Sequence, residues 1–169
     1  MIIFPGFSGI IYISHVIYES PEIQLLKGFC SIAFGESKEN VVKAFGEPEE
    51  VQNLTDDILN NNSLVFHYWD HGFSLFFDTH KDQAFCNVEI DNRDATLFGM
   101  KIFSLKEKEI VELMKQNGFE LSDTEMHQWG EKRISFDEAG LDCYFENNRL
   151  VSVNFGVLDS GTNFQYFPN

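Results

Sequence analysis

The chain has 169 residues, and its 27 acidic residues outnumber its 12 basic residues, which gives a formal net charge of −15. An acidic balance of this size argues against nucleic acid and against an anionic membrane surface as partners, because both attract clustered Lys and Arg. Hydrophobic residues make up 43% of the chain and include 18 Phe, so we expect a folded domain with a real core rather than a disordered chain.

The first 20 residues are apolar and could be mistaken for a signal peptide. The first basic residue is Lys27, and Pro5 and Gly6 interrupt the apolar run, so neither a signal peptide nor a membrane span is predicted. We expect residues 1–27 to form an N-terminal extension with a strand from Ile10 to Tyr18. A cytoplasmic location is the resulting expectation.

The rest of the chain reads as an internal duplication, with hydrophobic residues and turn residues recurring at an offset of about 69 residues. The matching segments are 28–46 with 97–115, 66–78 with 134–146, and 85–90 with 150–155. In the first segment Phe29 falls on Phe98, and Val41 falls on Ile110. We therefore predict repeats at 28–96 and 97–156 and a C-terminal tail at 157–169, all within a single compact domain.

Each repeat is predicted to hold a short strand, a helix and three further strands. Ser37 is the expected N-cap of the first helix, and Ser104 with Glu107 forms the expected capping box of the second. The expected buried stripes are Val41 and Phe45 in the first helix and Ile110, Leu113 and Met114 in the second. Gly46 and Gly118 end these helices.

Glycine-containing turns are predicted at 70–72 and 138–140, and the next turns at 79–84 and 147–149. Residues 47–63 and 119–132 are interpreted as variable linkers between helix and sheet. The predicted fold class is α+β: a tandem strand-helix-three-strand unit whose helices pack on one face of an antiparallel sheet.

Strand alternation divides the side chains between two faces of this sheet. The expected core side carries Phe66, Tyr68, Phe73, Leu75, Phe77, Cys86, Val88 and Ile90 in the first repeat, and Ile134, Phe136, Leu141, Cys143, Phe145, Val151, Val153 and Phe155 in the second. The opposite side carries His67, Trp69, Ser74, Phe76, Asn87 and Glu89, then Ser135, Asp137, Asp142, Tyr144, Ser152 and Asn154. One sheet face is thus expected to be polar and acidic, with aromatic side chains set into it.

The first repeat shows a recognisable order of residues: Gly35, Ser37, Val41, Phe45, Gly46 and Pro48, then Tyr68-Trp69, Gly72 and Phe76-Phe77-Asp78. It resembles the small α+β repeat shared by the SmpA/OmlA (BamE-type) outer-membrane assembly lipoproteins and the tandem β-lactamase-inhibitor proteins. The resemblance implies a binding module whose open sheet face grips another protein. The second repeat lacks the Gly-x-Pro, and no lipobox cysteine or cysteine pair per repeat is present, so a lipoprotein role is not carried over.

Catalytic and metal sites find little support in the sequence. His67, His71 and His80 do not converge on one point if the turn lies at 70–72, so no metal is expected. Cys86 and Cys143 are expected in an apolar layer, where a thiol is inert, and Cys30 has no adjacent basic group. The carboxylate pairs are typical of a solvated acidic surface, and no phosphate-binding loop is present. We expect no cofactor and no enzyme activity.

The preferred interpretation is an acidic immunity or inhibitor protein that blocks a basic protein partner, such as a toxin, through the polar face. The predicted binding residues are His67, Trp69, Phe76, Glu89, Asp137, Asp142 and Tyr144. If segment 10–18 or segment 163–167 folds back over the polar face, the face is closed to a partner and the predicted site does not exist. The alternatives are a small-molecule or lipid-binding domain with a pocket among Phe73, Phe76 and Phe98, and a homodimerising module. A monomer or a weak homodimer is expected.

Overall fold

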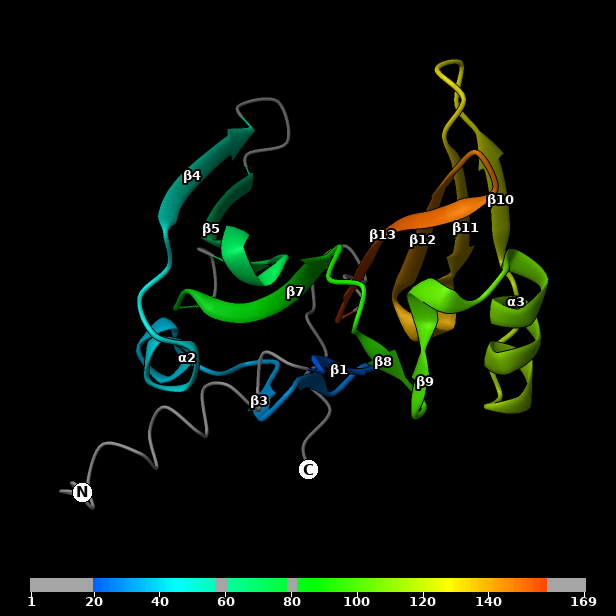
Figure 1. Cartoon of the computed structure of the whole chain (residues 1–169). Coiled ribbons are helices and arrows are strands. Elements are labelled where there is room, and N and C mark those ends of the chain that lie inside the picture. Colours follow the sequence, from blue (N-terminus) through cyan, green and yellow to red (C-terminus); the bar gives the residue numbers. More distant parts are fainter. Residues whose placement is uncertain (1–19, 57–60, 79–81, 158–169) are drawn as a thin grey trace, which may run out of the picture.

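The computed structural model describes residues 20–56, 61–78 and 82–157. These residues form an α+β structure made mostly of strands, with two α-helices and two β-sheets among them (Figure 1). The α+β class predicted from the sequence is therefore confirmed. The predicted strand at 10–18 and the segment 163–167 lie outside the described residues. No helix in the described part is long and apolar enough to cross a bilayer.

The elements fall into two successive groups along the chain. The first group comprises β1 (Glu22–Gln24), β2 (Gly28–Phe29), β3 (Ile32–Ala33), α2 (Lys38–Phe45), β4 (Glu50–Asp56), β5 (Asn61–Tyr68), η1 (Trp69–His71), β6 (Phe73–Asp78) and β7 (Ala84–Ile90). The second comprises β8 (Thr96–Leu97), β9 (Met100–Lys101), η2 (Ile102–Ser104), α3 (Glu107–Gln116), β10 (Asp123–Met126), β11 (Lys132–Phe136), η3 (Asp137–Ala139), β12 (Leu141–Glu146) and β13 (Arg149–Gly156). Each group thus begins with short strands, continues through one α-helix and ends in four strands.

A single eight-stranded sheet joins the two groups, in the order β10-β11-β12-β13-β7-β6-β5-β4. The two groups meet where β7 pairs antiparallel with β13, and Glu89 lies opposite Asn154 in this pairing. A smaller sheet has the order β3-β2-β1-β8-β9, and Ile23 of its central strand pairs with Phe29 on one side and with Leu97 on the other. Phe29 and Leu97 thus flank the same residue of β1, whereas Phe98 lies in the turn that follows β8.

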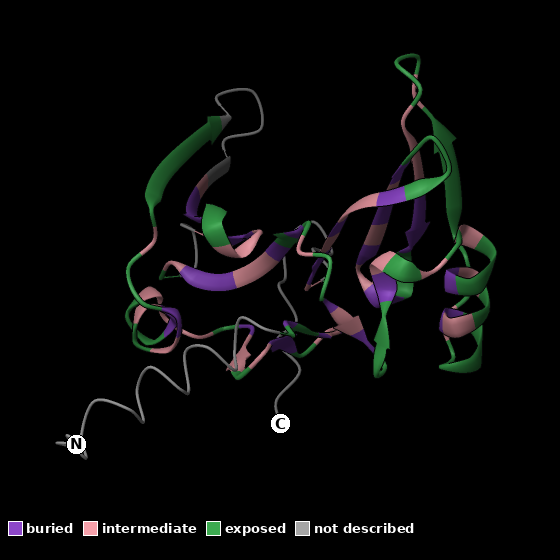
Figure 2. Ribbon diagram, viewed as in Figure 1, coloured by how far each residue is buried: buried purple, intermediate pink, exposed green. Residues whose placement is uncertain are grey.

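The two edges of the large sheet correct the prediction for residues 47–63 and 119–132. Both segments contain a strand, β4 and β10, instead of being linkers. Residues 50–55 and all of β10 are exposed, as the green edges in Figure 2 show. Because an edge strand can be held by main-chain hydrogen bonds without burying side chains, it lacks the alternating hydrophobic pattern that reveals a strand in sequence.

The two α-helices begin with different caps. The Ser37 hydroxyl accepts a backbone hydrogen bond from the first turn of α2, as predicted. The cap of α3 is Lys106 rather than Ser104: the Glu109 carboxylate accepts from the Lys106 backbone N–H at 2.7 Å. Ser104 instead ends η2, where its hydroxyl donates to the carbonyl of Lys101. Of the predicted stripes, Val41, Phe45, Ile110 and Met114 are buried, whereas Leu113 is only half-buried because it lies to one side of the buried stripe of α3.

The turns between strands follow the predicted glycines. Each of the short 3₁₀ helices η1 and η3 ends at a glycine with left-handed backbone angles: φ 70° and ψ 38° at Gly72, and φ 59° and ψ 36° at Gly140. A side chain at such angles is strained, so glycine suits both turns. The predicted turn at 147–149 is also present, with positive φ at Asn147 and Asn148. Part of the predicted turn at 79–84 lies outside the described residues.

A β-bulge in each half changes the predicted core. Cys86 and Val151 were expected in the core but are only half-buried, whereas the preceding residues, Phe85 and Leu150, are buried. The register shifts where β6 meets β7 and again where β12 meets β13, so one extra residue enters each second strand. One extra residue reverses the alternation, which strand periodicity alone does not reveal.

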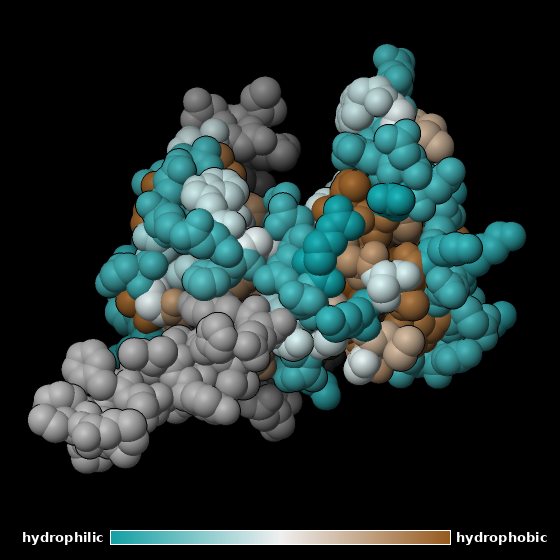
Figure 3. Space-filling model, in the orientation of Figure 1, coloured by the Kyte–Doolittle hydropathy of each residue, from teal (hydrophilic) through white to brown (hydrophobic). Residues whose placement is uncertain are grey.

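The core itself is rich in phenylalanine. Phe29 of the small sheet contacts Phe45 of α2, Phe73 of β6 and Phe155 of β13, with ring centroids 5.0–6.0 Å apart. It thus connects the small sheet to both halves of the large one. Seen from the side of Figure 1, hydrophilic residues cover most of the surface that the described residues form, and the largest hydrophobic area lies near α3 and β13 (Figure 3).

Candidate partner-binding face

A row of polar residues crosses the large sheet from one edge to the other. In order from β4 to β10 the paired residues are Glu50, His67, Ser74, Glu89, Asn154, Asp142, Ser135 and Asp123. Directly opposed residues of paired strands point to the same side of a sheet, so these side chains share one face. We call it the polar face; the core lies on the other side.

Trp69 is held rigidly on the first half of the polar face. Its indole lies flat on the ring of His67, with centroids 4.1 Å apart and an interplanar angle of 8°. The buried His67 ring is itself fixed, because its nitrogens lie 2.8 Å from the Ser74 hydroxyl and 3.0 Å from the Gln52 side-chain oxygen. The indole N–H donates to Glu50 at 3.4 Å. Trp69 nevertheless stays 57% exposed, so it offers a preorganised apolar contact.

A second tryptophan, which the sequence prediction missed, occupies the tip of the β10–β11 hairpin. Trp129 is 73% exposed and lies flat on His127, with centroids 4.5 Å apart and an angle of 1°. His127 lies 3.9 Å from Glu125, a polar-face residue opposite Arg133. Both tryptophans follow a histidine by two positions, so the repeated His-x-Trp spacing was the sequence signal that could have identified Trp129.

Arg133 supplies a cation on this acidic face and is bound by its neighbours. Its guanidinium lies 2.8 Å from Glu125 and 3.5 Å from Asp123. Partial burial lowers the pKa of Arg133, but the surrounding negative charges, of Asp142 and Glu125 above all, outweigh it and raise the pKa. Burial also raises the pKa of Tyr144, and the charge of Asp142 adds to that effect. Arg133 therefore stays charged and is neutralised by the face itself.

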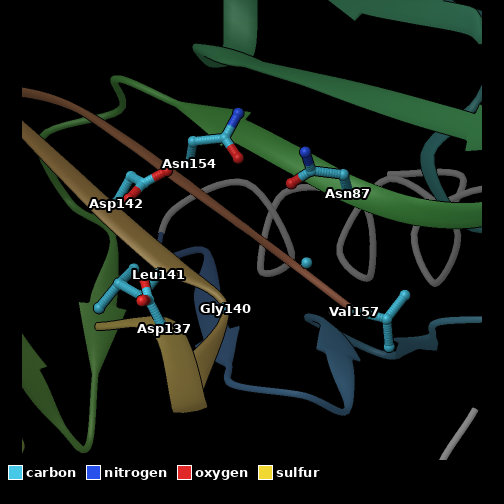
Figure 4. A pocket seen from close by; sticks show the side chains of 8 residues that line it. Asn87, Asp137, Gly140, Leu141, Asp142, Asn154 and Val157 are labelled. Atoms are coloured by element: carbon cyan, nitrogen blue, oxygen red, sulfur yellow. The ribbon is translucent and has the colours of Figure 1, made fainter. Parts of the chain in front are cut away.

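A polar pocket of about 290 Å³ opens on the second half of the face, beside the β7–β13 pairing (Figure 4). It is lined by Asn87, Asp137, Gly140, Leu141, Asp142, Asn154, Gly156 and Val157. In Figure 4 Asp142 and Asn154 lie on neighbouring strands, with Asp137 beside Leu141 and with Asn87 and Val157 toward the other end. The Ser135 hydroxyl donates to Asp142 and fixes its carboxylate.

The sheet register places five of the predicted binding residues on one face, Trp69 and Asp137 lie in the adjoining 3₁₀ helices, and the seven do not form one tight cluster. His67 and Trp69 lie at one end, Glu89 lies at the β7–β13 pairing, and Asp137 and Asp142 line the pocket. The remaining two, Phe76 and Tyr144, are half-buried between their neighbours. Trp69 is thus the fully projecting aromatic residue of the predicted set, and Trp129 is the projecting residue that the set lacks.

The cysteines are poorly suited to nucleophilic chemistry. Burial raises the pKa of the Cys30 thiol to about 11 and that of Cys86 to about 12. The fully buried Cys143 has its pKa raised further by the same cause. A thiol needs a lowered pKa to react at neutral pH, so these groups stay protonated. Within residues 20–56, 61–78 and 82–157, no group of three or more His, Cys, Asp and Glu residues is placed to hold a metal ion.

The predicted pocket among Phe73, Phe76 and Phe98 is not formed by these three residues. Phe73 is buried in the core, Phe76 lies on the polar face, and Phe98 is 41% exposed at the β8–β9 turn. A different groove of about 560 Å³ runs between α2 and the β4–β5 hairpin. Its lining includes Val42, Val51, Leu64 and Phe66 together with Lys38, Glu39 and Glu47.

No family model matches the chain, and no curated protein matches it. Among solved structures, a DUF4309 family protein (YjgB) from Bacillus subtilis is similar at 18% sequence identity with a TM-score of 0.45, over 85% of this chain and 92% of that one. Similarity at this level assigns neither a family nor a function, so the function is argued from the polar face.

Proposed function

We propose that the protein is a non-enzymatic binding module that holds a basic protein partner on its polar face, in the manner of an immunity or inhibitor protein. The observation that carries the proposal is the polar row across all eight strands, with a rigid exposed tryptophan in each half. Exposed aromatic residues surrounded by carboxylates suit a protein interface, where a few aromatic anchors supply most of the binding energy.

The charge of the chain determines which partner fits. With a net charge of −15, the protein attracts cationic partners from a distance and repels acidic ones. Arg133, a basic side chain beside this row, is already bound to Glu125 and Asp123. The remaining carboxylates of the face, such as Glu89 and Asp137, are exposed and available to cations from outside.

We also propose that the two halves are copies of one unit, similar to the SmpA/OmlA and β-lactamase-inhibitor repeat. Three equivalences support this: left-handed glycines at Gly72 and Gly140, bulges at Cys86 and Val151, and matching helix stripes. Phe45 of α2 packs on Phe73, and Glu107 of α3 binds Lys132, which lies on the core side of β11. These contacts support helices that cover the side opposite the polar face.

The strand pairing further supports a two-fold relation between the copies. Glu89 and Asn154 correspond in the alignment of 85–90 with 150–155, and they lie opposite each other where β7 meets β13. Phe29 and Leu97 likewise lie on either side of Ile23. Equivalent residues that face each other across antiparallel strands are typical of an isologous, two-fold interface.

The test of the binding function begins with affinity capture on the full chain at low and at high salt. Basic proteins retained only at low salt are identified, purified and measured by calorimetry. Trp69→Ala and Tyr144→Ala are each expected to weaken binding by about 2 kcal/mol. Phe98→Ala is the matched control, because Phe98 is an exposed aromatic residue of the small sheet. Unchanged affinity in the first two variants would overturn the polar face as the binding site.

A second candidate function is supported by the groove beside α2, whose apolar lining suits a small apolar molecule. Its test is the fluorescence of a neutral dye such as Nile red in the presence of wild type and of Val51→Glu. Saturable binding to the wild type that the variant loses would support a ligand site there. Dye binding that does not saturate, or that the variant keeps, would remove this candidate.

A further inference from the structure

The two halves carry a cavity at equivalent positions, but the two cavities differ in size. The first, of about 80 Å³, is lined by Trp69, Gly72, Phe73, Ser74, Glu89 and Asp91. Their equivalents in the second half are Asp137, Gly140, Leu141, Asp142, Asn154 and Gly156, and all of these line the pocket of about 290 Å³. Larger side chains line the first cavity: Trp69 and Asp91 stand where the second pocket has Asp137 and Gly156.

The backbone around the two cavities is built in the same way. The backbone N–H of Asp91 donates to the Gly72 carbonyl at 3.0 Å, and that of Gly156 donates to the Gly140 carbonyl at 3.0 Å. A Cβ at residue 156 would lie 2.6 Å from the Cys86 carbonyl oxygen, so glycine is required there. The two cavities therefore share the backbone hydrogen bond to the turn glycine, whereas the close approach of the backbone at Gly156 belongs to the second half.

The side chains of the larger pocket combine negative charge with an apolar wall. Asp137 and Asp142 contribute carboxylates, while Leu141 and Val157 contribute aliphatic surface. Among the described residues that line the pocket there is no Lys or Arg. Such a lining repels anions and matches a group with a cationic head and an apolar stem.

We infer that this pocket receives a single arginine side chain of the basic partner. This inference rests on the proposed function. The planar guanidinium offers five donors in a fixed fork, which can engage Asp137 and Asp142 while the stem lies on Val157. A volume of about 290 Å³ lies at the lower limit of small-ligand pockets, so it suits one side chain rather than a larger ligand.

The test uses N-acetyl-arginine methylamide as the probe and ¹⁵N-labelled full chain as the receptor in an NMR titration. The backbone amides of Gly140 and Gly156 should shift and saturate. Asp137→Asn and Asp142→Asn should each weaken binding about tenfold or more, because the negative charge that pairs with the guanidinium is removed. Glu138→Gln is the matched control: it removes the same charge from an exposed residue of η3 that does not line the pocket.

A larger side chain at residue 137 tests the arginine pocket independently. Asp137→Trp reproduces the residue found at the equivalent position of the first half, where a tryptophan is accommodated in the same turn. It should abolish the saturating shifts while leaving the unfolding temperature close to that of the wild type. Equal binding by wild type, Asp137→Asn and Asp137→Trp, or equal affinity for the matching lysine derivative, would overturn the arginine pocket.

The outcomes separate this inference from the function on which it rests. If a basic partner binds and loses affinity in Trp69→Ala but not in Asp137→Asn or Asp142→Asn, the binding face stands and the arginine pocket is wrong. If the arginine probe binds as expected but no basic protein is captured, the pocket stands as a guanidinium site and the proposed partner is wrong.

Discussion

Trp69 and Trp129 each lie flat on a histidine two positions earlier in the chain. A ring that is already held in one orientation loses little conformational entropy when a partner covers it. The histidines beneath them differ in their supports: hydrogen bonds to Ser74 and Gln52 fix His67, whereas His127 has carboxylates nearby. Trp129, at the tip of the β10–β11 hairpin, is the more exposed of the two tryptophans and so offers more surface to a partner.

Trp129→Ala should weaken binding of the basic partner by about 2 kcal/mol. Because the side chain is 73% exposed, its removal should change the free energy of unfolding by less than about 0.5 kcal/mol. Calorimetric titration and urea unfolding measure the two quantities separately. Met126→Ala serves as the control on the same hairpin, since Met126 is 66% exposed and alternates to the other side of β10. Equal losses of affinity in both variants would contradict a specific contact by the indole.

The raised pKa values of the thiols predict a loss of stability at alkaline pH. Unfolded thiols ionise near the ordinary value of 9.0, whereas Cys30 keeps its proton to about 11 and Cys86 to about 12. Below pH 9 both states are protonated and the stability is complete. As the pH rises from about 9 to 11, the unfolded chain releases protons that the folded chain retains, so the free energy of unfolding falls.

Urea unfolding at about pH 7.5, 9 and 10.5 measures this decline. Cys86→Ala should show a smaller decline than the wild type over the same range, because one of the titrating thiols is gone. A decline of the same size in both proteins would assign the alkaline effect to other groups, such as lysines and tyrosines.

The pairing of β7 with β13 holds the two halves of the large sheet together, and Gly156 lies within it. Gly156→Ala should destabilise the protein by about 2 kcal/mol, because the new Cβ would lie 2.6 Å from a backbone oxygen that cannot move freely. Urea unfolding is the measurement. Ser152→Ala, half-buried on the same strand, should change the stability by less than about 0.5 kcal/mol. A neutral Gly156→Ala would show that the strands can separate without cost.

Most elements that bury several side chains could be predicted from the sequence, whereas the three-residue strand β1, which buries Ile23 in a second sheet, and the edge strands could not. Helix stripes such as Val41 with Phe45 and the glycine turns at Gly72 and Gly140 follow from periodicity and backbone conformation. Strands β4 and β10 have no such signature, because their stability comes from main-chain pairing at the sheet edges. The bulges at Cys86 and Val151 depend on the register between two paired strands, and the sequence of one strand alone does not determine that register.

The residues of the candidate site likewise fall into those that local strand alternation predicts and those that depend on tertiary contacts. Alternation placed His67, Glu89 and Asp142 on the polar face, since strand parity is a local property. Trp129 was overlooked because its segment was interpreted as a linker. The pocket at Asp137 depends on the close approach of two backbones at Gly156, a tertiary relation that spacing in the sequence does not contain.

The net charge of −15 gives the whole molecule two opposite responses to salt. At about 10 mM salt, charges interact over roughly 30 Å, so the carboxylates repel one another and destabilise the fold. Raising NaCl to about 0.5 M should increase the unfolding temperature by a few degrees and lower the association rate with a basic partner by about one to three orders of magnitude. Scanning calorimetry and stopped-flow mixing measure these changes. A salt-independent association rate would argue against electrostatic capture.

The contact between Glu89 and Asn154 has a consequence for how such a molecule could have arisen. If the two halves are copies of one unit, as we propose, an ancestor of two identical chains with glutamate at this position would set that residue against its own copy, and like charges directly opposed on a sheet are unfavourable. Joining the copies in one polypeptide permits the replacement of a single member of that pair. For the same reason, a fused chain can carry the indole of Trp69 in one half and the open pocket beside Asp137 in the other. Two identical chains could not differ in this way.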